Sequence, residues 1–336
     1  MHLATSSVVC IDRERDARTS VATPRGMNKG SLHLLSEAFA RSLPLPTEIN
    51  PPLKDALGHV LDNPGSLVRP RMVLQVGLAF GLGEDAARDL AVALEYFHTS
   101  SLIFDDLPCM DNADDRRGAP CVHRIYGEHE AILAALALIN RAYALTWQAI
   151  ADSSKFARTS GMAYLEKCLG VSGLLNGQSL DLNYASLPHT CQTTERIALG
   201  KTVSLIRLTL VLPALLGGAT RREIQLLERV SVCWGLGYQI VDDLKDVLQT
   251  TDQTGKTVAR DALLDRPNIA TAIGVDGAVE RLTRLIGLGD RALSMLLDLR
   301  PNLLFLVKLR GDLQDELNHV IANVGDNKEL DPGTNL

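Results

Sequence analysis

Leucine and alanine dominate long stretches of this chain, and few of these stretches alternate apolar and polar residues as β-strands do. Aromatic residues, which favour strands, make up only 4% of the sequence. The stretches between breakers instead predict helices, at 31–41, 52–61, 69–80, 84–107, 130–151, 159–178, 193–216, 221–248, 278–297 and 303–322. Several exceed about 20 residues without a heptad pattern, so we expect one large all-α bundle.

The middle of the chain contains no linker rich in proline, glycine or serine that would separate two domains. A chain of 336 residues that is 46% hydrophobic can bury a large core. We therefore predict a single helical domain over residues 31–324. Both ends are polar and rich in breakers, which predicts a disordered tail at 1–30 and a flexible tail at 325–336.

The charge balance excludes some partners. Lys and Arg total 34 against 40 Asp and Glu, so the net charge of −6 gives no general attraction to nucleic acid or to an anionic membrane. The longest apolar stretches, at 131–139 and 208–216, are shorter than the roughly 20 residues that span a bilayer. The first thirty residues lack the apolar core of a signal peptide and contain Asp12, Glu14 and Asp16. We expect a cytoplasmic protein that is not integral to a membrane.

An acidic cluster follows the helix expected at 84–107. Its five carboxylates occupy eleven positions, at Asp105, Asp106, Asp111, Asp114 and Asp115. Pro108 predicts that the helix ends just after Asp106, which places the first two carboxylates at its C-terminus. Negative charge there opposes the helix dipole, so we expect a nearby cation: Arg116, Arg117 or a bound metal ion.

A second cluster lies inside the helix expected at 221–248. Asp242, Asp243 and Asp246 lie three, four and seven residues after Gln239, which places all four on one stripe of a helix. Like charges at this spacing repel by a few tenths of a kcal/mol per pair, and more where they are partly buried. We therefore expect groups that compensate these charges.

Both clusters offer ligands that suit Mg²⁺, which prefers oxygen and typically binds one or two carboxylates together with substrate phosphates. Two facing clusters would hold a diphosphate through bridging metal ions. For either cluster alone, a solvated acidic face is the simpler interpretation. The presence of two clusters, each beside an apolar helix, favours the metal site.

The residues Asp-Asp-x-x-x-x-Asp followed by Arg-Arg-Gly, together with the later Gln-x-x-Asp-Asp-x-x-Asp, resemble the motifs of the trans-isoprenyl diphosphate synthases, or polyprenyl synthetases. The resemblance is dense over 94–118 and 237–257 and weaker over 30–320, and it is strongest to synthases of geranylgeranyl and farnesyl diphosphate. It implies a homodimeric all-α bundle around a central apolar cavity. It also implies a prenyltransferase that uses Mg²⁺, up to three ions, to ionise an allylic diphosphate and join it head-to-tail to isopentenyl diphosphate.

The resemblance also implies the site residues. The metal ligands would be Asp105, Asp106, Asp111, Asp242, Asp243 and Asp246. Residues at the allylic diphosphate would be Arg116, Lys201, Thr202, Gln239 and Lys256; Lys201, Asp105, Asp106, Asp242 and Asp243 would be the catalytic group. Isopentenyl diphosphate would be held by Arg69, His98 and Arg117. This set agrees with the chemistry, because a departing diphosphate needs compensating charge and an allylic cation needs protection from water.

The chain departs from the family pattern in places. The family usually has Gly-Gly-Lys-x-x-Arg-Pro, whereas residues 64–70 read Pro-Gly-Ser-Leu-Val-Arg-Pro, so Ser66 stands where a lysine is usual. A charged hydrogen bond contributes about 1.5–3 kcal/mol, so its loss would weaken acceptor binding tenfold or more. Further departures are Val203 in place of a glycine, Ala135-Leu136 in place of Gly-Asp, and Arg266-Pro267 in place of a stretch that contains lysine. The allylic site is expected to be intact and the acceptor site diverged.

Three functions stay open at this point. The chain is a chain-elongating synthase with altered acceptor binding, a diverged terpene synthase or prenyltransferase with another acceptor, or a non-catalytic regulatory subunit on the same fold. The complete acidic clusters argue against the third, since a binding protein has no need of six aligned metal ligands.

Product length follows from the helix before the first cluster, where bulky side chains form the floor of the tail cavity in this family. Ser100 and Ser101 are small here, and Phe97 is the next obstacle, one turn further down. One turn of helix is about 5.4 Å, close to the length of one isoprene unit. We therefore predict the C20 product, geranylgeranyl diphosphate. Two serines that merely relieve crowding between helices are the alternative.

Overall fold

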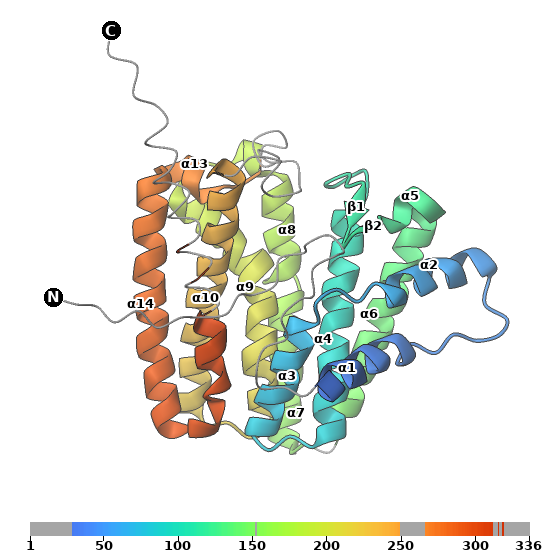
Figure 1. Cartoon of the computed structure of the whole chain (residues 1–336), viewed down its shortest axis with the longest axis horizontal. Helices are drawn as coiled ribbons and strands as arrows, with labels where there is room; N and C mark the ends of the chain where they lie inside the picture. The colour runs from blue at the N-terminus through green and yellow to red at the C-terminus, as the bar shows by residue number, and fades with distance from the viewer. Residues whose placement is uncertain (1–28, 152, 249–265, 312–314, 316–317, 319–336) are drawn as a thin grey trace, which may run out of the picture. The chain divides into compact units, whose positions relative to one another are not determined.

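The structure is a computed structural model that describes residues 29–151, 153–248, 266–311, 315 and 318. Helices dominate the described residues, which confirms the all-α prediction (Figure 1). The elements group into two compact units. We name them by their central helices: the α4 unit is the described part of 12–166 and 208–220, and the α10 unit is the described part of 167–207 and 221–336. The single domain over 31–324 and the two tails stay predictions.

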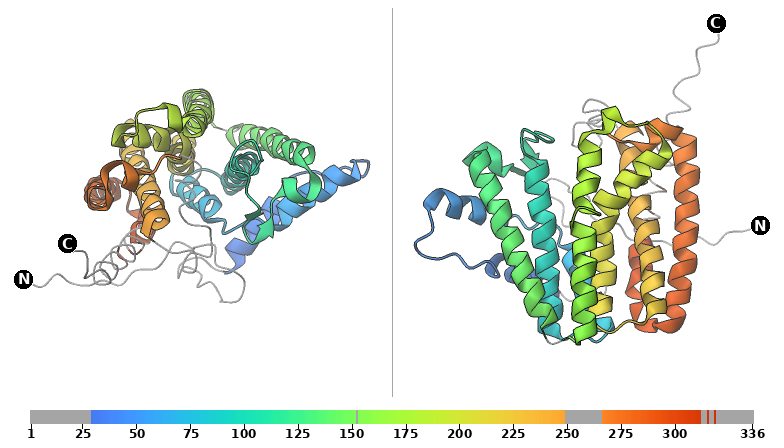
Figure 2. Two further views of the ribbon diagram at one scale, coloured as in Figure 1. Left: turned by 90° about the horizontal axis from the view of Figure 1, so that it is seen from above. Right: turned by 180° about the vertical axis from the view of Figure 1, so that it is seen from behind.

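In the α4 unit, the central helix lies between α3 and α6 (Figures 1 and 2). The elements are α1 (Lys29–Arg41), α2 (Pro51–Asp62), α3 (Val68–Ala79), α4 (Glu84–Asp105), β1 (Asp115–Arg116), β2 (Ala119–Pro120), α5 (Val122–Tyr126), α6 (Glu128–Ile150) and most of α7 (Lys155–Leu169), with the end of α9. All residues from 90 to 100 of α4 are buried. The Tyr96 hydroxyl donates to the Phe39 carbonyl over 2.5 Å, which attaches α4 to α1.

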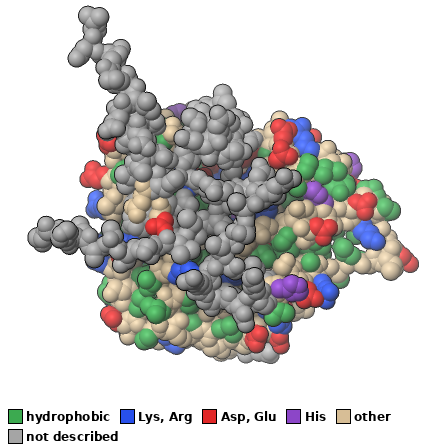
Figure 3. Space-filling model, in the orientation of Figure 1, with side chains coloured by type: hydrophobic (Ala, Val, Ile, Leu, Met, Phe, Trp, Pro, Cys, Tyr) green, Lys and Arg blue, Asp and Glu red, His purple; other side chains and the backbone are tan. Residues whose placement is uncertain are grey.

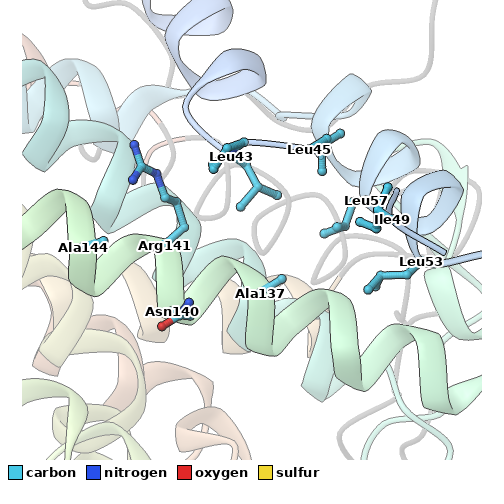
Figure 4. Close-up of a pocket in the computed structure, with 10 residues that line it drawn as sticks. Leu43, Leu45, Ile49, Leu53, Leu57, Ala137, Asn140, Arg141 and Ala144 are labelled. Atoms are coloured by element: carbon cyan, nitrogen blue, oxygen red, sulfur yellow. The ribbon is translucent and has the colours of Figure 1, made fainter. Parts of the chain in front are cut away.

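A pocket of about 320 Å³ lies in the same unit between α6 on one side and, on the other, α2 with the segment that joins α1 to α2 (Figure 4). Leu43, Leu45, Ile49, Leu53 and Leu57 line one side, and Ala137, Asn140, Arg141 and Ala144 of α6 line the other. The Arg141 guanidinium donates to the Ser42 carbonyl over 2.5 Å. None of the site residues predicted from the sequence lines this pocket.

In the α10 unit, α10 and α14 run side by side (Figures 1 and 2). The elements are α8 (Leu174–Leu182), the 3-10 helix η1 (Tyr184–Ser186), the first part of α9 (Cys191–Leu216), α10 (Arg221–Leu248), α13 (Ile269–Ile273), α14 (Val275–Leu299) and η2 (Pro301–Leu303). A Cβ on Gly289 of α14 would lie 3.2 Å from the Cys233 Cβ of α10, so the two helices approach closely at this glycine. The ion pair Arg281–Glu195, 2.5 Å long, joins α14 to α9. The ion pair Arg300–Glu223, also 2.5 Å, joins the C-terminal end of α14 to α10.

The helix predicted at 159–178 is wrong as a single element. The structure has α7 and α8 there, separated at residues 170–173. A Cβ on Gly173 would lie 2.2 Å from the Cys168 carbonyl oxygen, so the break between the helices lies at a position that only glycine can occupy. The β1–β2 hairpin and the short helices α5 and α13 were not predicted from the sequence.

Two features of the structure relate to the predictions about nucleic acid and membranes: the charge on the described surface and the apolar helix α9. Acidic and basic side chains are interspersed over the described part of the face shown in Figure 3. Among the described residues, α9 is long and apolar enough to cross a membrane by length and composition. Because 56% of its most apolar window is buried inside the protein, the helix gives only weak evidence for a span.

Candidate functional site

Helix α4 ends where Pro108 predicts: Asp105 is its last residue and Asp106 is the C-cap. The Asp106 carboxylate is buried, 4% exposed, and pairs with Arg116. Arg116 Nη2 lies 2.6 Å from Asp106 Oδ1, and Nε donates to both carboxylate oxygens over 3.1 and 3.3 Å. Of the cations that the sequence left open for this helix end, Arg116 contacts Asp106.

A thiol joins this contact. Cys121 hydrogen-bonds to Asp106, and burial, followed by the charge of Asp106, raises the pKa of the Cys121 thiol to about 12. The thiol therefore stays protonated and is a donor to the carboxylate. Asp106 is thus surrounded by donors of the protein itself.

Asp105 and Asp111 are more accessible than Asp106, since both are half-buried. The Asp111 backbone N–H donates to the Asp105 carbonyl over 2.9 Å, which brings the two residues together. Within the described residues, no three His, Cys, Asp or Glu side chains form a ready-made metal cage. A metal ion held here would need oxygen ligands from a substrate or from water as well, which is usual for Mg²⁺.

The β1–β2 hairpin separates the roles of two neighbouring arginines (Figure 1). Its two-residue turn consists of Arg117 and Gly118, with φ of 57° and 75°. Positive φ at both positions suits the twist of a hairpin, but it costs a residue other than glycine about 1–2 kcal/mol. Arg116 lies on β1 and pairs with Asp106, whereas Arg117 pairs with Glu95 on α4 at 3.0 Å.

The predicted acceptor residues gather beside α4. Arg69 Nη1 lies 3.0 Å from His98 Nε2. Burial and then the charges of Arg69, Arg117 and Arg116 hold the pKa of His98 well below its usual value. His98 is therefore neutral at pH 7 and accepts from Arg69 through Nε2, which places its proton on Nδ1. Ser66, at the position of the usual lysine, is exposed.

Glu95 is a functional candidate that the sequence analysis missed. It is 2% exposed and is the only Asp, Glu, Lys or Arg between residues 90 and 104. Burial raises the pKa of Glu95, while Arg117 and Arg69 oppose that shift. The signal in the sequence is a single carboxylate within an otherwise apolar stretch of helix, which indicates a buried charged partner.

In the α10 unit, Asp243 is held by a chain of hydrogen bonds. Thr202 Oγ1 donates to Gln239 Oε1 over 2.7 Å, and Gln239 Nε2 donates to Asp243 Oδ1 over 2.8 Å. The Ile269 backbone N–H donates to Asp243 Oδ2 over 2.7 Å, and Asn268 Nδ2 donates to its carbonyl. These donors compensate the carboxylate, which is 1% exposed, and attach the start of α13 to α10.

The two other carboxylates of this cluster are more accessible. Asp242 is exposed and Asp246 is half-buried. Each Asp-Asp pair is thus divided in the same way: the second carboxylate is buried among protein donors and the first faces outward more.

Lys201 pairs with Asp181 of α8 at 2.9 Å, and Arg266 Nη1 lies 3.8 Å from the same oxygen. A Cβ on Gly177 of α8 would lie 2.4 Å from the Lys201 backbone nitrogen, so this glycine lets α8 and α9 approach closely enough for the pair. Asp181 was missed in the sequence. Lys256 lies outside the described residues.

Val203, a departure from the family pattern, packs inside the α10 unit, and its effect on the acceptor site stays a prediction. Its side chain is fully buried, and a Cβ on Gly235 of α10 would lie 2.7 Å from Val203 Cγ2. Val203 of α9 therefore fills space that Gly235 leaves free within the α10 unit.

Residues predicted to set product length lie on α4. The hydroxyls of Ser100 and Ser101 donate to the carbonyls of Phe97 and His98, each over 2.8 Å. Phe97 is buried edge-on against Tyr143 of α6, with ring centroids 4.9 Å apart. Both serine side chains are small and hydrogen-bond to the backbone of their own helix, whereas the bulky Phe97 ring packs against Tyr143.

The sequence profile of the polyprenyl synthetase family matches residues 50–289, which is more than half of the chain. The chain belongs to the polyprenyl synthetase family. A chloroplastic geranylgeranyl pyrophosphate synthase of Capsicum annuum is 36% identical over 229 residues, which are 68% of this chain and 62% of that protein. The chloroplastic geranylgeranyl pyrophosphate synthase 9 of Arabidopsis thaliana is 36% identical over 239 residues, 69% of this chain and 66% of that one. The matches thus span less than two thirds of these relatives.

Among solved structures, this polyprenyl synthetase is similar to a geranyltransferase of Helicobacter pylori in complex with magnesium and isoprenyl diphosphate. The TM-score is 0.68 at 25% identity, over 92% of this chain and all of that one. This likeness confirms the isoprenoid synthase-like helical fold. That the two acidic clusters share one ligand stays a prediction.

Proposed function

We propose that this family member is a Mg²⁺-dependent trans-prenyltransferase that ionises an allylic diphosphate and joins it head-to-tail to isopentenyl diphosphate. The observation that carries the proposal is the end of α4. There, the accessible carboxylates of Asp105 and Asp111 lie in the same unit as three arginines, Arg69, Arg116 and Arg117, and a neutral histidine. Carboxylates for metal ions beside guanidinium groups for phosphate oxygens suit a diphosphate substrate.

The proposed metal ligands are Asp105 and Asp111 in the α4 unit and Asp242 and Asp246 in the α10 unit, because Asp242 is exposed and the other three are only partly buried. Mg²⁺ bound there would neutralise the diphosphate as the carbon–oxygen bond breaks. Asp106 and Asp243, also predicted as ligands, keep their protein donors in this proposal and hold the local backbone. The relative with magnesium and isoprenyl diphosphate supports the ion but not the number of three.

Polar side chains of the chain then position the substrates. Arg116, Lys201, Thr202, Gln239 and Lys256 bind the allylic diphosphate, and Lys201 is oriented by Asp181. Arg69, His98 and Arg117 bind the acceptor diphosphate, to which neutral His98 offers Nδ1–H. Fixed donors aimed at developing negative charge stabilise the transition state without reorganisation.

For the product we propose geranylgeranyl diphosphate. The short serines above Phe97 and the Phe97–Tyr143 contact support a floor one turn below Ser101. The names of the plant relatives agree with a C20 product.

A homodimer is also proposed, and α6 is the expected interface. Five large apolar side chains of this helix are more than a third exposed, at Ile132, Leu133, Leu136, Tyr143 and Trp147. An apolar stripe of this kind commonly marks a protein interface. Sedimentation velocity of the purified chain tests this, because a monomer at micromolar concentration contradicts it.

For the compartment we keep the cytoplasmic prediction, although the names of both plant relatives include a chloroplast location. Its basis is the first thirty residues, of which 1–28 lie outside the described residues. Imaging of a C-terminal fluorescent fusion in cells decides between the two.

One observation favours a second function. An exposed Ser66 stands where the family usually has a lysine, which removes a cation from the acceptor site, so a different acceptor or cyclisation of the allylic substrate is the alternative. Incubation with Mg²⁺ and farnesyl diphosphate, with and without isopentenyl diphosphate, separates the candidates. A C20 diphosphate formed only with isopentenyl diphosphate supports elongation. Diphosphate release with a hydrocarbon product in its absence supports a terpene synthase. No turnover, together with enhancement of a partner synthase, supports a regulatory subunit.

A further inference from the structure

Glu95 is the buried counter-charge of the arginine cluster beside α4. Its carboxylate oxygen Oε1 lies 3.0 Å from Arg117 Nη2, and both side chains are almost fully buried. Arg117 Nη1 also donates to the Asn63 carbonyl over 3.2 Å and to Thr99 Oγ1 over 3.4 Å. Three of the five guanidinium N–H groups are thus committed to protein acceptors, and the guanidinium is fixed in one orientation.

The backbone at Arg117 requires such a partner. A left-handed φ of 57° is unfavourable for arginine, so this conformation persists only where the surroundings hold it. The side chain also passes over Gly65, where a Cβ would lie 2.6 Å from Arg117 Nε. Glu95 therefore fixes the hairpin turn on one side and, through Arg117, the loop that leads into α3 and Arg69.

The charges in this cluster are unequal. Arg69 and Arg117 contribute two positive charges, Glu95 contributes one negative charge, and His98 is neutral. Glu95 binds Arg117 directly and Arg69 contacts His98, so the positive charges among these four side chains outnumber the negative charges by one.

We propose that Glu95 is a positioning residue for the acceptor diphosphate, acting through Arg117 and the hairpin turn. It does not touch the substrate. This inference rests on the proposed function, because it assigns Arg69, His98 and Arg117 to the acceptor.

Glu95→Gln tests the inference, since it keeps the shape of the side chain and removes its charge. We expect the KM for isopentenyl diphosphate to rise tenfold or more, while the KM for the allylic diphosphate stays within twofold. In an Arg117→Gln background, Glu95→Gln should have no further effect on the acceptor KM. A purely structural role would raise both KM values or would add to the effect of Arg117→Gln, and either result overturns the proposal, as does an unchanged acceptor KM.

Glu223→Gln is the matched control, because Glu223 is also a buried partner of an arginine, Arg300, but lies at the opposite end of α10 from Asp242. It should leave both KM values unchanged.

If Glu95→Gln does not fold, Glu95→Asp, which keeps the charge and withdraws it by one methylene, should show the same selective rise. If the wild-type chain does not consume isopentenyl diphosphate, the proposed function fails. Calorimetric titration with isopentenyl diphosphate then tests the role of Glu95 separately. Tenfold weaker binding by Glu95→Gln supports that role, and equal binding overturns it.

Discussion

Substitution of the two aspartates at 242 and 243 separates a buried, hydrogen-bonded carboxylate from an exposed one. Asp243 accepts from the Ile269 backbone N–H and from Gln239 Nε2, one donor at each oxygen. Asp243→Asn is nearly isosteric, but its amide nitrogen must face one of these donors. One charge-assisted hydrogen bond, about 1.5–3 kcal/mol, is then lost, and a buried donor is left without an acceptor, at a further cost of about 1–3 kcal/mol.

We therefore expect Asp243→Asn to lower the free energy of unfolding by about 2.5–6 kcal/mol. At roughly 2–4 °C per kcal/mol for a large domain, the melting temperature should fall by roughly 5–24 °C. Asp242 is exposed, so Asp242→Asn should change stability by less than about 0.5 kcal/mol. Asp242→Asn should nevertheless lower kcat strongly, because the proposal gives Asp242 a metal ion.

The assay is thermal melting followed by circular dichroism, in buffer with chelator so that no metal ion contributes to stability. Steady-state turnover with Mg²⁺ is measured on the same preparations. Equal melting temperatures for the two variants, or a larger loss of stability for Asp242→Asn, would refute the assignment of Asp243 as the structural member of the pair.

Three further results are expected. Ser66→Lys should lower the KM for isopentenyl diphosphate about tenfold by restoring a charged donor, with Ser66→Gln as the uncharged control, and an unchanged KM contradicts the role of this position. Ser100→Tyr should shorten the product towards C15 in chromatography of dephosphorylated products, and an unaltered product distribution rejects the floor above Phe97. His98 is held neutral in the folded protein, so unfolded chains bind more protons below about pH 6.5 and stability falls as the pH drops. Urea unfolding should show wild type losing about 1 kcal/mol between pH 6.5 and 5.5 relative to His98→Gln, and parallel curves would show that His98 titrates normally.

Features that depend on residues close together in the sequence were predicted well. Pro108 gave the end of α4 to within two residues, and the spacing of Gln239 and Asp243 gave a shared helix face on which the two side chains hydrogen-bond. Both follow from rules that involve at most one or two turns of helix.

Features that depend on distant residues were not predictable in this way. The sequence could not tell which arginine pairs with Asp106, because the answer depends on the left-handed turn at Arg117 and on Glu95, 22 residues earlier in the chain. Asp243 is satisfied by Ile269, 26 residues later. The break between α7 and α8 depends on the contact of Gly173 with the Cys168 carbonyl, and glycine alone is too common a residue to signal it.

The division within each Asp-Asp pair has a geometric cause. Successive residues of a helix point about 100° apart, so two adjacent aspartates point to different sides of the helix. At Asp242 and Asp243, one carboxylate turns outward and the other turns into the helix packing, where Gln239 and α13 supply its donors. At Asp105 and Asp106, Arg116 and Cys121 supply them instead. A buried carboxylate fully matched by fixed donors holds its backbone rigidly, and the neighbouring carboxylate, one residue away on that backbone, is thereby positioned for a ligand.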